Sequence, residues 1–399
     1  MSDRYRVASR ANVPPFHVMD LLAAGATRQR THGDLLNLLA GQPSTGAPQP
    51  VRDEAIRLLN SPDPLGYTPA TGILELRQAI AGHHRRTHGL DVHPDDVIVT
   101  TGSSGGFLLA FLAAFEAGDR VAMARPGYPC YRNVLTALGC QVVEIGTGPD
   151  TRFQPTVTQL DALHDATPGG LSGLVVASPA NPTGTMLLPA ELAALATWCE
   201  EHRVQLISDE IYHGIEYAAL TGDAPLARSA WETSRDAVVF NSFSKYFSMT
   251  GWRIGWMLAP EHLRRAVDVL AGNFTICPPA LAQHAAIAAF DDASYAELDA
   301  HVRRYAHNRA LLLDGLTDLG ITRLAPADGA FYVHADVGHL TDDTMTFAHD
   351  LLARTGVGVA PGIDFDLVEG HRHVRLSFAG PTAEIEQALS RLATFVADR

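Results

Sequence analysis

The chain has 399 residues, of which 46% are hydrophobic and 19% charged, and its formal net charge is −14. This length exceeds what one hydrophobic core usually organises, so we expect two packed units or one large α/β domain with an appendage. The negative charge argues against broad binding to nucleic acids or anionic membranes, because both require clustered Lys and Arg.

The first two thirds of the chain alternate short β-rich runs with helical stretches. Apolar spacing predicts helices over 74–84, 107–115 and 189–203. Runs rich in β-branched residues predict strands over 97–99, 120–123, 141–145, 174–177, 204–208 and 237–241. Such alternation is typical of a mostly parallel sheet covered by helices.

Beyond about residue 281 the pattern changes to long helices, over 281–290 and 295–319, followed by separate strands over 331–333 and 374–378. This change predicts a second, α+β unit, joined to the first by the helix over 295–319. We therefore expect an N-terminal arm and part of the small domain in 1–45, a large domain in 46–290 and a small C-terminal domain in 291–399.

Histidines are abundant, and His84 and His88 have the i,i+4 spacing that puts two imidazoles on one helix face. No acidic residue lies between them, and the neighbouring arginines indicate a solvated face. We predict no metal site there.

Features of the remaining sequence bear on the compartment. The four cysteines are far apart and form no C-x-x-C pair, so neither a disulfide scaffold nor a zinc site is indicated. The first fifteen residues are polar, and the longest apolar run, 107–115, is too short to span a bilayer. We expect a cytoplasmic protein that is neither exported nor anchored.

The most specific stretch is SFSKYFSMTGWRIGW, from Ser242 to Trp256. Desolvation of Lys245 after a buried strand would lower the pKa of its amine, and a free amine attacks aldehydes. Arg253 can present a fixed fork to a phosphate. Taken singly, they are more simply a surface Lys and a structural Arg. Together they resemble the class I/II aminotransferases of fold-type I pyridoxal-phosphate enzymes, whose lysine segment has S-x-S-K followed by G-W-R-I-G.

The resemblance extends over nearly the whole chain. It implies an α/β fold like that of aspartate aminotransferase, with a mostly parallel seven-stranded sheet covered by helices and a smaller α+β domain. It also implies pyridoxal 5′-phosphate held by Lys245 as a Schiff base. The implied activity is ping-pong transfer of an α-amino group from an amino acid to a 2-oxo acid.

The residues DEIY, 209–212, close the predicted strand 204–208, where open α/β sheets bind ligands. A buried anion beside a pyridine nitrogen keeps it protonated, which makes the ring an electron sink. Alternation along the strand should point Glu210 away, so we assign this role to Asp209. The resemblance implies that Asn181, in SPANPTG, and Tyr212 donate to the phenolic oxygen of the cofactor.

The loop TTGSSGG, 100–106, lies between a predicted strand and an apolar helix. Small residues there let N–H groups and hydroxyls converge on an anion at a helix N-terminus, although many strand-helix turns are similar. The resemblance implies that Gly102, Ser103 and Ser104 bind the cofactor phosphate, together with Ser242 and Arg253.

Further positions follow from the same resemblance. Tyr128 would stack on the pyridine ring, and a buried structural tyrosine is the competing interpretation. Tyr67 would reach the phosphate of a neighbouring subunit, which implies a homodimer with composite sites. Arg375 would bind the substrate α-carboxylate, because a guanidinium makes two parallel bonds to that group. Gly41 and Asn181 would complete this substrate site.

Alternatives on the same scaffold are a lyase, cyclase or oxidase, because one carbanionic intermediate has several fates. A non-catalytic regulator is disfavoured, because regulators that resemble this family carry an added DNA-binding domain and we expect no room for one in this chain. Some aspartate-directed relatives have Lys at the position of Ser104, and its absence disfavours aspartate. The apolar segment VPPF, 13–16, resembles the part of these enzymes that closes over the substrate, which favours a neutral or hydrophobic substrate side chain.

Overall fold

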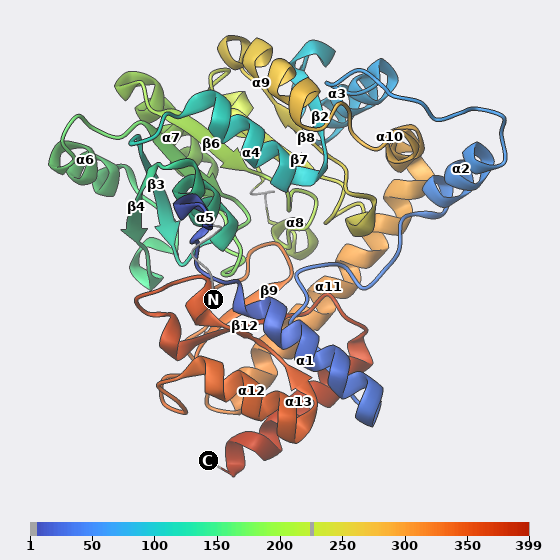
Figure 1. Cartoon of the computed structure of the whole chain (residues 1–399). Coiled ribbons are helices and arrows are strands. Elements are labelled where there is room, and N and C mark those ends of the chain that lie inside the picture. The colour runs from blue at the N-terminus through green and yellow to red at the C-terminus, as the bar shows by residue number, and fades with distance from the viewer. Residues whose placement is uncertain (1–5, 224–226, 399) are drawn as a thin grey trace.

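The computed structural model describes residues 6–223 and 227–398. Its elements form two groups (Figure 1), one around a seven-stranded sheet and one around a smaller sheet that includes β9 (Tyr332–Asp336) and β12 (His373–Ser377). The long helix α11 (Asp292–Asp318) runs between them, where the sequence predicted a connecting helix.

The large sheet has the strand order β2-β8-β7-β6-β5-β3-β4. The strands are β2 (Val97–Thr100), β3 (Arg120–Arg125), β4 (Gln141–Gly146), β5 (Gly173–Ala177), β6 (Gln205–Asp209), β7 (Val238–Ser242) and β8 (Gly255–Leu258). Strand β8 is antiparallel to both of its neighbours, β2 and β7, and the remaining strand pairs of this sheet are parallel. The predicted mostly parallel sheet is therefore confirmed, with β8 as the strand that the sequence pattern did not indicate.

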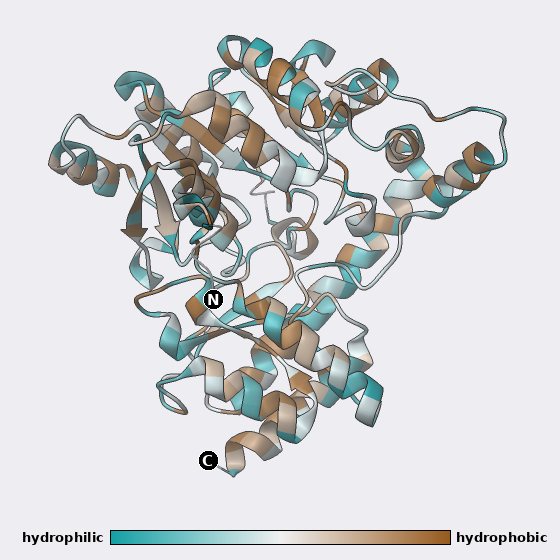
Figure 2. Cartoon of the chain, in the orientation of Figure 1, coloured by the Kyte–Doolittle hydropathy of each residue, from teal (hydrophilic) through white to brown (hydrophobic). Residues whose placement is uncertain are grey.

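Helices surround this sheet, and their hydrophobic residues are interspersed with hydrophilic ones while the central strands are largely hydrophobic (Figure 2). The helices that pack on its strands include α3 (Leu74–His88), α4 (Gly102–Ala114), α5 (Pro129–Leu138) and α7 (Pro189–His202). The same part of the chain also contains α2 (Gln49–Leu59), α6 (Val157–Ala166), α8 (Ala218–Thr221), α9 (Glu261–Phe274) and α10 (Ala280–Ala286). Helix α4 begins five residues earlier than predicted, immediately after the loop that follows β2. Its N-terminus therefore lies at the sheet edge where ligands bind.

The second group combines the two ends of the chain. It contains α1 (His17–His32), β1 (Leu36–Asn37), β9 (Tyr332–Asp336), α12 (Thr344–Thr355), β10 (Val357–Gly358), β11 (Ala360–Pro361), β12 (His373–Ser377) and α13 (Thr382–Ala397). Strand β12 lies between β11 and β9 and is antiparallel to both, whereas β1 pairs in parallel with β10. Within the described ranges, no helix is long and apolar enough to cross a membrane.

The solvated face predicted for His84 and His88 is wrong. His84 is 1% exposed, and its Nε2 accepts a hydrogen bond of 3.1 Å from Trp256 Nε1 on β8. The His88 side chain is also largely covered. Helix α3 turns Arg85 and Arg86 outward and packs the histidine face onto the sheet, so burial lowers the pKa of both imidazoles. The described residues contain no cluster of His, Cys, Asp and Glu arranged to hold a metal ion.

Candidate active site

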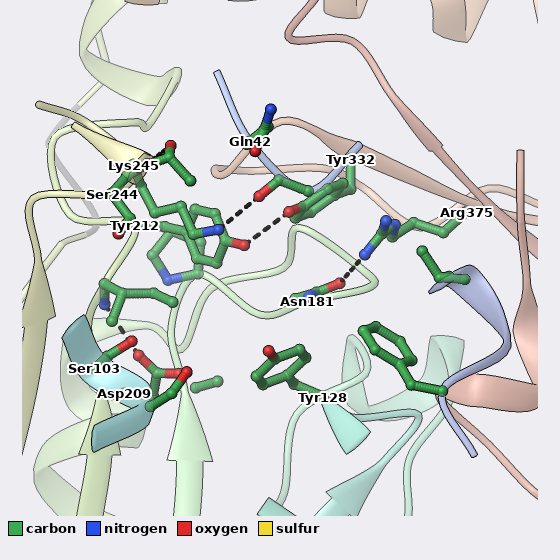
Figure 3. Close-up of a pocket in the computed structure, with 18 of the residues that line it drawn as sticks. Gln42, Ser103, Tyr128, Asn181, Asp209, Tyr212, Ser244, Lys245, Tyr332 and Arg375 are labelled. Atoms are coloured by element: carbon green, nitrogen blue, oxygen red, sulfur yellow. Dashed lines mark hydrogen bonds between the residues drawn. The ribbon is translucent and has the colours of Figure 1, made fainter. Parts of the chain in front are cut away.

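A cavity of about 230 Å³ lies where the two groups meet, beyond the carboxyl ends of β5 and β6 (Figure 3). Most of the predicted site residues line it. They are Gly41, Ser103, Ser104, Tyr128, Asn181, Asp209, Tyr212, Lys245, Arg253 and Arg375. Residues from widely separated parts of the sequence therefore converge on one cavity.

Lys245 enters the cavity from the loop after β7, on the side opposite Arg375 (Figure 3). Its Nζ donates a hydrogen bond of 2.6 Å to the carbonyl oxygen of Gly41. Burial and, to a smaller extent, the charge of Arg375 lower the pKa of the amine to about 8, although Asp209 acts in the opposite direction. An appreciable fraction of the amine is therefore uncharged and nucleophilic near neutral pH. Lys245 is also the only lysine in the sequence, so composition by itself could have identified it as the Schiff-base lysine.

Asp209 is the last residue of β6 and is 2% exposed. One carboxylate oxygen accepts a hydrogen bond from the Tyr131 hydroxyl, and the other accepts one of 3.1 Å from the Ile211 N–H. Burial raises the pKa of Asp209 more than the hydrogen bonds from Tyr131 and Ile211 lower it, and the result is a pKa of about 6. A positively charged partner at this point would lower the pKa again by stabilising the anion.

Glu210 faces away from the cavity, as strand alternation predicts. Its Oε1 accepts hydrogen bonds from the Ser208 hydroxyl at 2.9 Å and the Ala230 N–H at 2.8 Å. Burial raises the pKa of Glu210 to about 8. The adjacent carboxyl groups therefore have separate surroundings.

Arg375, on β12, is held in place by acceptors and aromatic rings. Its Nη1 donates to Asn181 Oδ1 at 2.9 Å and its Nη2 to the Leu39 carbonyl at 2.6 Å. The guanidinium carbon lies 4.4 Å from the ring centroid of Tyr332 and 4.9 Å from that of Phe365. Among the described residues, none accepts a hydrogen bond from its buried Nε. A carboxylate ligand would supply such an acceptor.

Gly41 packs closely against Arg375 and Tyr332. A Cβ added at Gly41 would lie 3.0 Å from the Tyr332 hydroxyl and 3.9 Å from Arg375 Nη1. A larger residue there would therefore displace the groups around the guanidinium.

Two tyrosines that the sequence motifs did not indicate, Tyr131 and Tyr332, also line the cavity. Tyr332, at the start of β9, shares a hydrogen bond of 2.8 Å with the Tyr212 hydroxyl. Tyr131 lies in the first turn of α5, three residues after Tyr128, which is the N-cap residue of that helix. The Tyr128 ring lies 6.4 Å from that of Phe16 and 5.5 Å from that of Tyr131.

The opposite end of the cavity has the features of an anion site. Helix α4 directs its first turn, which includes Ser103 and Ser104, towards this end. Arg253 Nη1 donates to the Thr250 carbonyl at 3.0 Å and lies 3.4 Å from Ser244 Oγ. Helix N-terminus, guanidinium and hydroxyls all favour a bound anion.

Gly102 and Ser242 lie behind this surface instead of lining it. Gly102 has φ +70°, and a Cβ there would lie 2.5 Å from Arg253 Nη2, so glycine is required on both counts. Ser242 Oγ accepts a hydrogen bond of 3.1 Å from the Ser244 N–H, and Ser244 is the serine that lines the cavity. The S-x-S-K motif contains both serines and could not distinguish them.

Tyr67 lies outside the cavity, on the segment between α2 and α3, and is 85% exposed.

The residues fit pyridoxal phosphate. The cavity holds an amine of lowered pKa, a buried carboxylate, an anion site at one end and an arginine with an unused donor at the other. Together with the mostly parallel sheet, this donor set defines a pyridoxal-phosphate-dependent enzyme of fold type I.

The chain belongs to the family of class I and II aminotransferases, whose family profile matches residues 33–392. It is 61% identical over 391 residues to the valine–pyruvate aminotransferase of Mycobacterium tuberculosis, covering 98% of each chain. It is 35% identical over 373 residues to the aspartate/prephenate aminotransferase of Thermus thermophilus, covering 93% of each.

Solved structures agree with this assignment. An aminotransferase from Mycobacterium tuberculosis superposes with a TM-score of 0.95 at 60% identity, covering 99% of this chain and all of the other. Aspartate aminotransferase from Thermus thermophilus with maleate gives a TM-score of 0.89 at 33% identity, covering 98% and 99%. The chain is a pyridoxal-phosphate-dependent amino acid:2-oxo acid aminotransferase, which confirms the predicted fold, cofactor and reaction.

Proposed function

We propose that this aminotransferase takes its amino group from a neutral branched-chain amino acid, with L-valine as the principal donor and pyruvate as the acceptor. The apolar wall of the cavity carries this proposal. Helix α1 and the residue before it contribute Phe16, Val18, Met19 and Leu22. Such a wall favours an aliphatic side chain, since burying methyl groups is favourable and burying a second carboxylate without a partner is costly.

The distribution of charge supports a neutral side chain. Among the described lining residues, the cations besides Arg375 are Lys245 and Arg253, and Arg253 belongs to the anion site at the far end. Ser104 stands where some aspartate-directed relatives have lysine. The 61% identity to a valine–pyruvate aminotransferase points to the same substrate class.

Lys245 is the proposed covalent and proton-transferring residue. Pyridoxal phosphate, when bound, supplies an aldehyde that condenses with amines and a ring that withdraws electrons from the substrate Cα. Lys245 Nζ would bond to the aldehyde carbon between turnovers. Once the substrate amine has displaced it, its free amine would carry the proton that leaves Cα. Its lowered pKa and its position between Gly41 and Tyr212 support both roles.

Asp209 is the proposed partner of the ring nitrogen. A carboxylate at this buried strand end would hold the proton on that nitrogen, and its hydrogen bonds from Tyr131 and Ile211 would fix its orientation. Tyr128 would stack on the ring. Asn181 and Tyr212 would donate to the phenolic oxygen.

The two ends of the cavity have different proposed roles. Ser103, Ser104 and Arg253, with Gly102 and Ser242 behind them, would hold the phosphate, and we add Ser244 because it lines the cavity. Arg375 would bind the substrate carboxylate, with Gly41 and Asn181 alongside. Substrate and cofactor would thus be fixed from opposite sides, which orients Cα for proton transfer.

We further propose a homodimer in which Tyr67 completes the site of the partner subunit. Tyr67 is 85% exposed, and α2 and the end of α9 also carry exposed apolar side chains, namely Ile56, Leu59, Phe274 and Ile276. A second subunit would cover such side chains, and burying apolar surface favours association. The proposed boundaries remain 1–45 for the arm and part of the small domain, 46–290 for the large domain and 291–399 for the small domain.

The cytoplasm is the proposed location. All four cysteines are unpaired, and Cys140 and Cys199 are buried thiols. Free thiols are typical of a reducing compartment. Fractionation of cells that express the full chain tests this assignment.

The substrate proposal is tested by mixing the holoenzyme with each standard amino acid in turn and following conversion of the bound cofactor to its amine form. Valine and other branched aliphatic amino acids should convert it faster than aspartate or glutamate. Faster conversion by an acidic amino acid would overturn the proposal.

A further inference from the structure

The apolar wall of the cavity is attached to the other end of the chain by one carboxylate. Asp364 lies in a 3₁₀ turn between β11 and β12 and is 2% exposed. Its Oδ1 accepts a hydrogen bond from the His17 N–H and its Oδ2 one from the Val18 N–H, both of 2.8 Å. These N–H groups belong to the first turn of α1, the turn that presents the apolar side chains to the cavity.

Asp364 replaces a local helix cap. The residue at the N-cap of α1 is Phe16, which has no side-chain acceptor for the first N–H groups. An anionic acceptor at a helix N-terminus makes strong, charge-assisted hydrogen bonds. The N-terminal end of α1 is therefore fixed by a residue 346 positions away.

The segment around Asp364 is itself fixed to the substrate end of the cavity. The Asp364 carbonyl accepts from Arg132 Nη2 at 3.3 Å, and the Phe365 carbonyl accepts from the Gly127 N–H at 2.9 Å. The Phe365 ring packs 4.9 Å from the Arg375 guanidinium. The wall and the arginine thus share one short stretch of backbone as their support.

We propose that Asp364 is a positioning residue that determines substrate specificity, because it sets the distance between the α1 wall and Arg375. The inference rests on the proposed preference for branched aliphatic donors. A substrate carboxylate on Arg375 and a side chain against Phe16 and Val18 would be bound at two fixed points. Loosening α1 would weaken contacts with a branched side chain and would leave alanine, which is too short to use the wall, almost unaffected.

The experiment compares kcat/KM for L-valine and L-alanine in the wild-type holoenzyme, Asp364→Ala and Asp364→Asn. Asp364→Ala should lower the valine-to-alanine ratio about tenfold, the scale of discrimination by a few methyl groups. Asp364→Asn keeps one acceptor oxygen and should fall between the two. The cofactor absorbance without substrate should not change.

Asp343→Ala is the matched control. Asp343 also caps a helix, accepting from the Met345 and Thr346 N–H groups at 3.0 and 3.2 Å, but none of the residues of α12 lines the cavity. This variant should lower the melting temperature without changing the ratio. An equal loss of kcat/KM for both substrates in Asp364→Ala would show a merely structural role and overturn the proposal.

A double-mutant cycle with Phe16→Ala distinguishes positioning of the α1 wall from a general loss of activity. If Asp364→Ala does not fold, Asp364→Asn takes its place in the cycle. In the Phe16→Ala background the Asp364 substitution should change the ratio much less, since part of the wall is already gone. Additive effects would contradict the proposal. If the wild-type enzyme does not use valine, the substrate proposal fails by itself, and the same ratios are measured with the longest aliphatic donor that it accepts.

Discussion

Arg375 Nη1 donates a hydrogen bond of 2.9 Å to Asn181 Oδ1, joining β12 to the loop that follows β5. Arg375, proposed to bind the substrate carboxylate, is therefore hydrogen-bonded to Asn181, proposed to bind the phenolic oxygen of the cofactor. A substitution of Arg375 would also disturb the orientation of Asn181, so even the conservative replacement by lysine should affect the site.

Arg375→Lys should lower kcat/KM for valine about 100-fold, or about 2.7 kcal/mol, because one ammonium group cannot serve Asn181, the Leu39 carbonyl and a bidentate carboxylate together. Steady-state kinetics measure this loss. Arg372→Lys, which alters a salt bridge with Asp336 outside the cavity, is the control and should retain activity. Equal activity of both variants would exclude Arg375 from carboxylate binding.

Asp209→Asn should retain the cofactor, because the phosphate site is untouched, yet slow Cα proton removal about 10³-fold or more, roughly 4 kcal/mol. The substitution removes the charge that holds the ring proton. Single-turnover absorbance changes measure the rate. Glu210→Gln should change little, since burial already raises the pKa of Glu210 to about 8 and keeps it largely protonated at neutral pH. A nearly unchanged rate for Asp209→Asn with a large loss for Glu210→Gln would show that the proposed position of the cofactor ring is wrong.

The rate at which cofactor-free enzyme bonds to added pyridoxal phosphate should rise with pH, reach half its maximum near pH 8 and level off above it. Burial lowers the pKa of Lys245 from 10.5 to about 8, so the reactive free amine increases about tenfold per pH unit below that value and is already dominant between 8 and 10.5. Asp209→Asn removes a group that raises this pKa and should move the midpoint to lower pH. Lys245→Arg leaves the sequence without lysine and should give no borohydride-reducible bond. A rise that continues to pH 10 would contradict the lowered pKa.

Mixing Tyr67→Ala and Lys245→Ala subunits under conditions of exchange should restore part of the activity. In a composite site the hybrid dimer has one site with both lesions and one with neither. Activity of the mixture against that of each parent is the measurement, with mass spectrometry to prove exchange. No recovery despite proven exchange would show that Tyr67 does not act across an interface.

The sequence predicts the strands well because parallel strands buried on both faces, such as β5 and β7, are nearly continuous apolar runs. Strand β8 escapes prediction because its four residues follow directly on the turn that carries Arg253. Residues within recognisable motifs, such as Asn181 in SPANPTG, can be assigned to the site from the sequence, because the motif itself carries the signal. Tyr131, Tyr332 and Asp364 are not, because their partners lie 78, 120 and 346 positions away, and only the fold brings them together.

The most direct test of the proposed reaction is a stoichiometric half-reaction. L-Valine added to the holoenzyme without an oxo acid should convert the cofactor to its amine form, release one equivalent of the corresponding branched 2-oxo acid per site, and stop. Pyruvate should then restore the original absorbance and yield one equivalent of alanine. Continued product formation without pyruvate, with release of ammonia or hydrogen peroxide, would contradict transamination, and no conversion by valine would contradict the proposed donor.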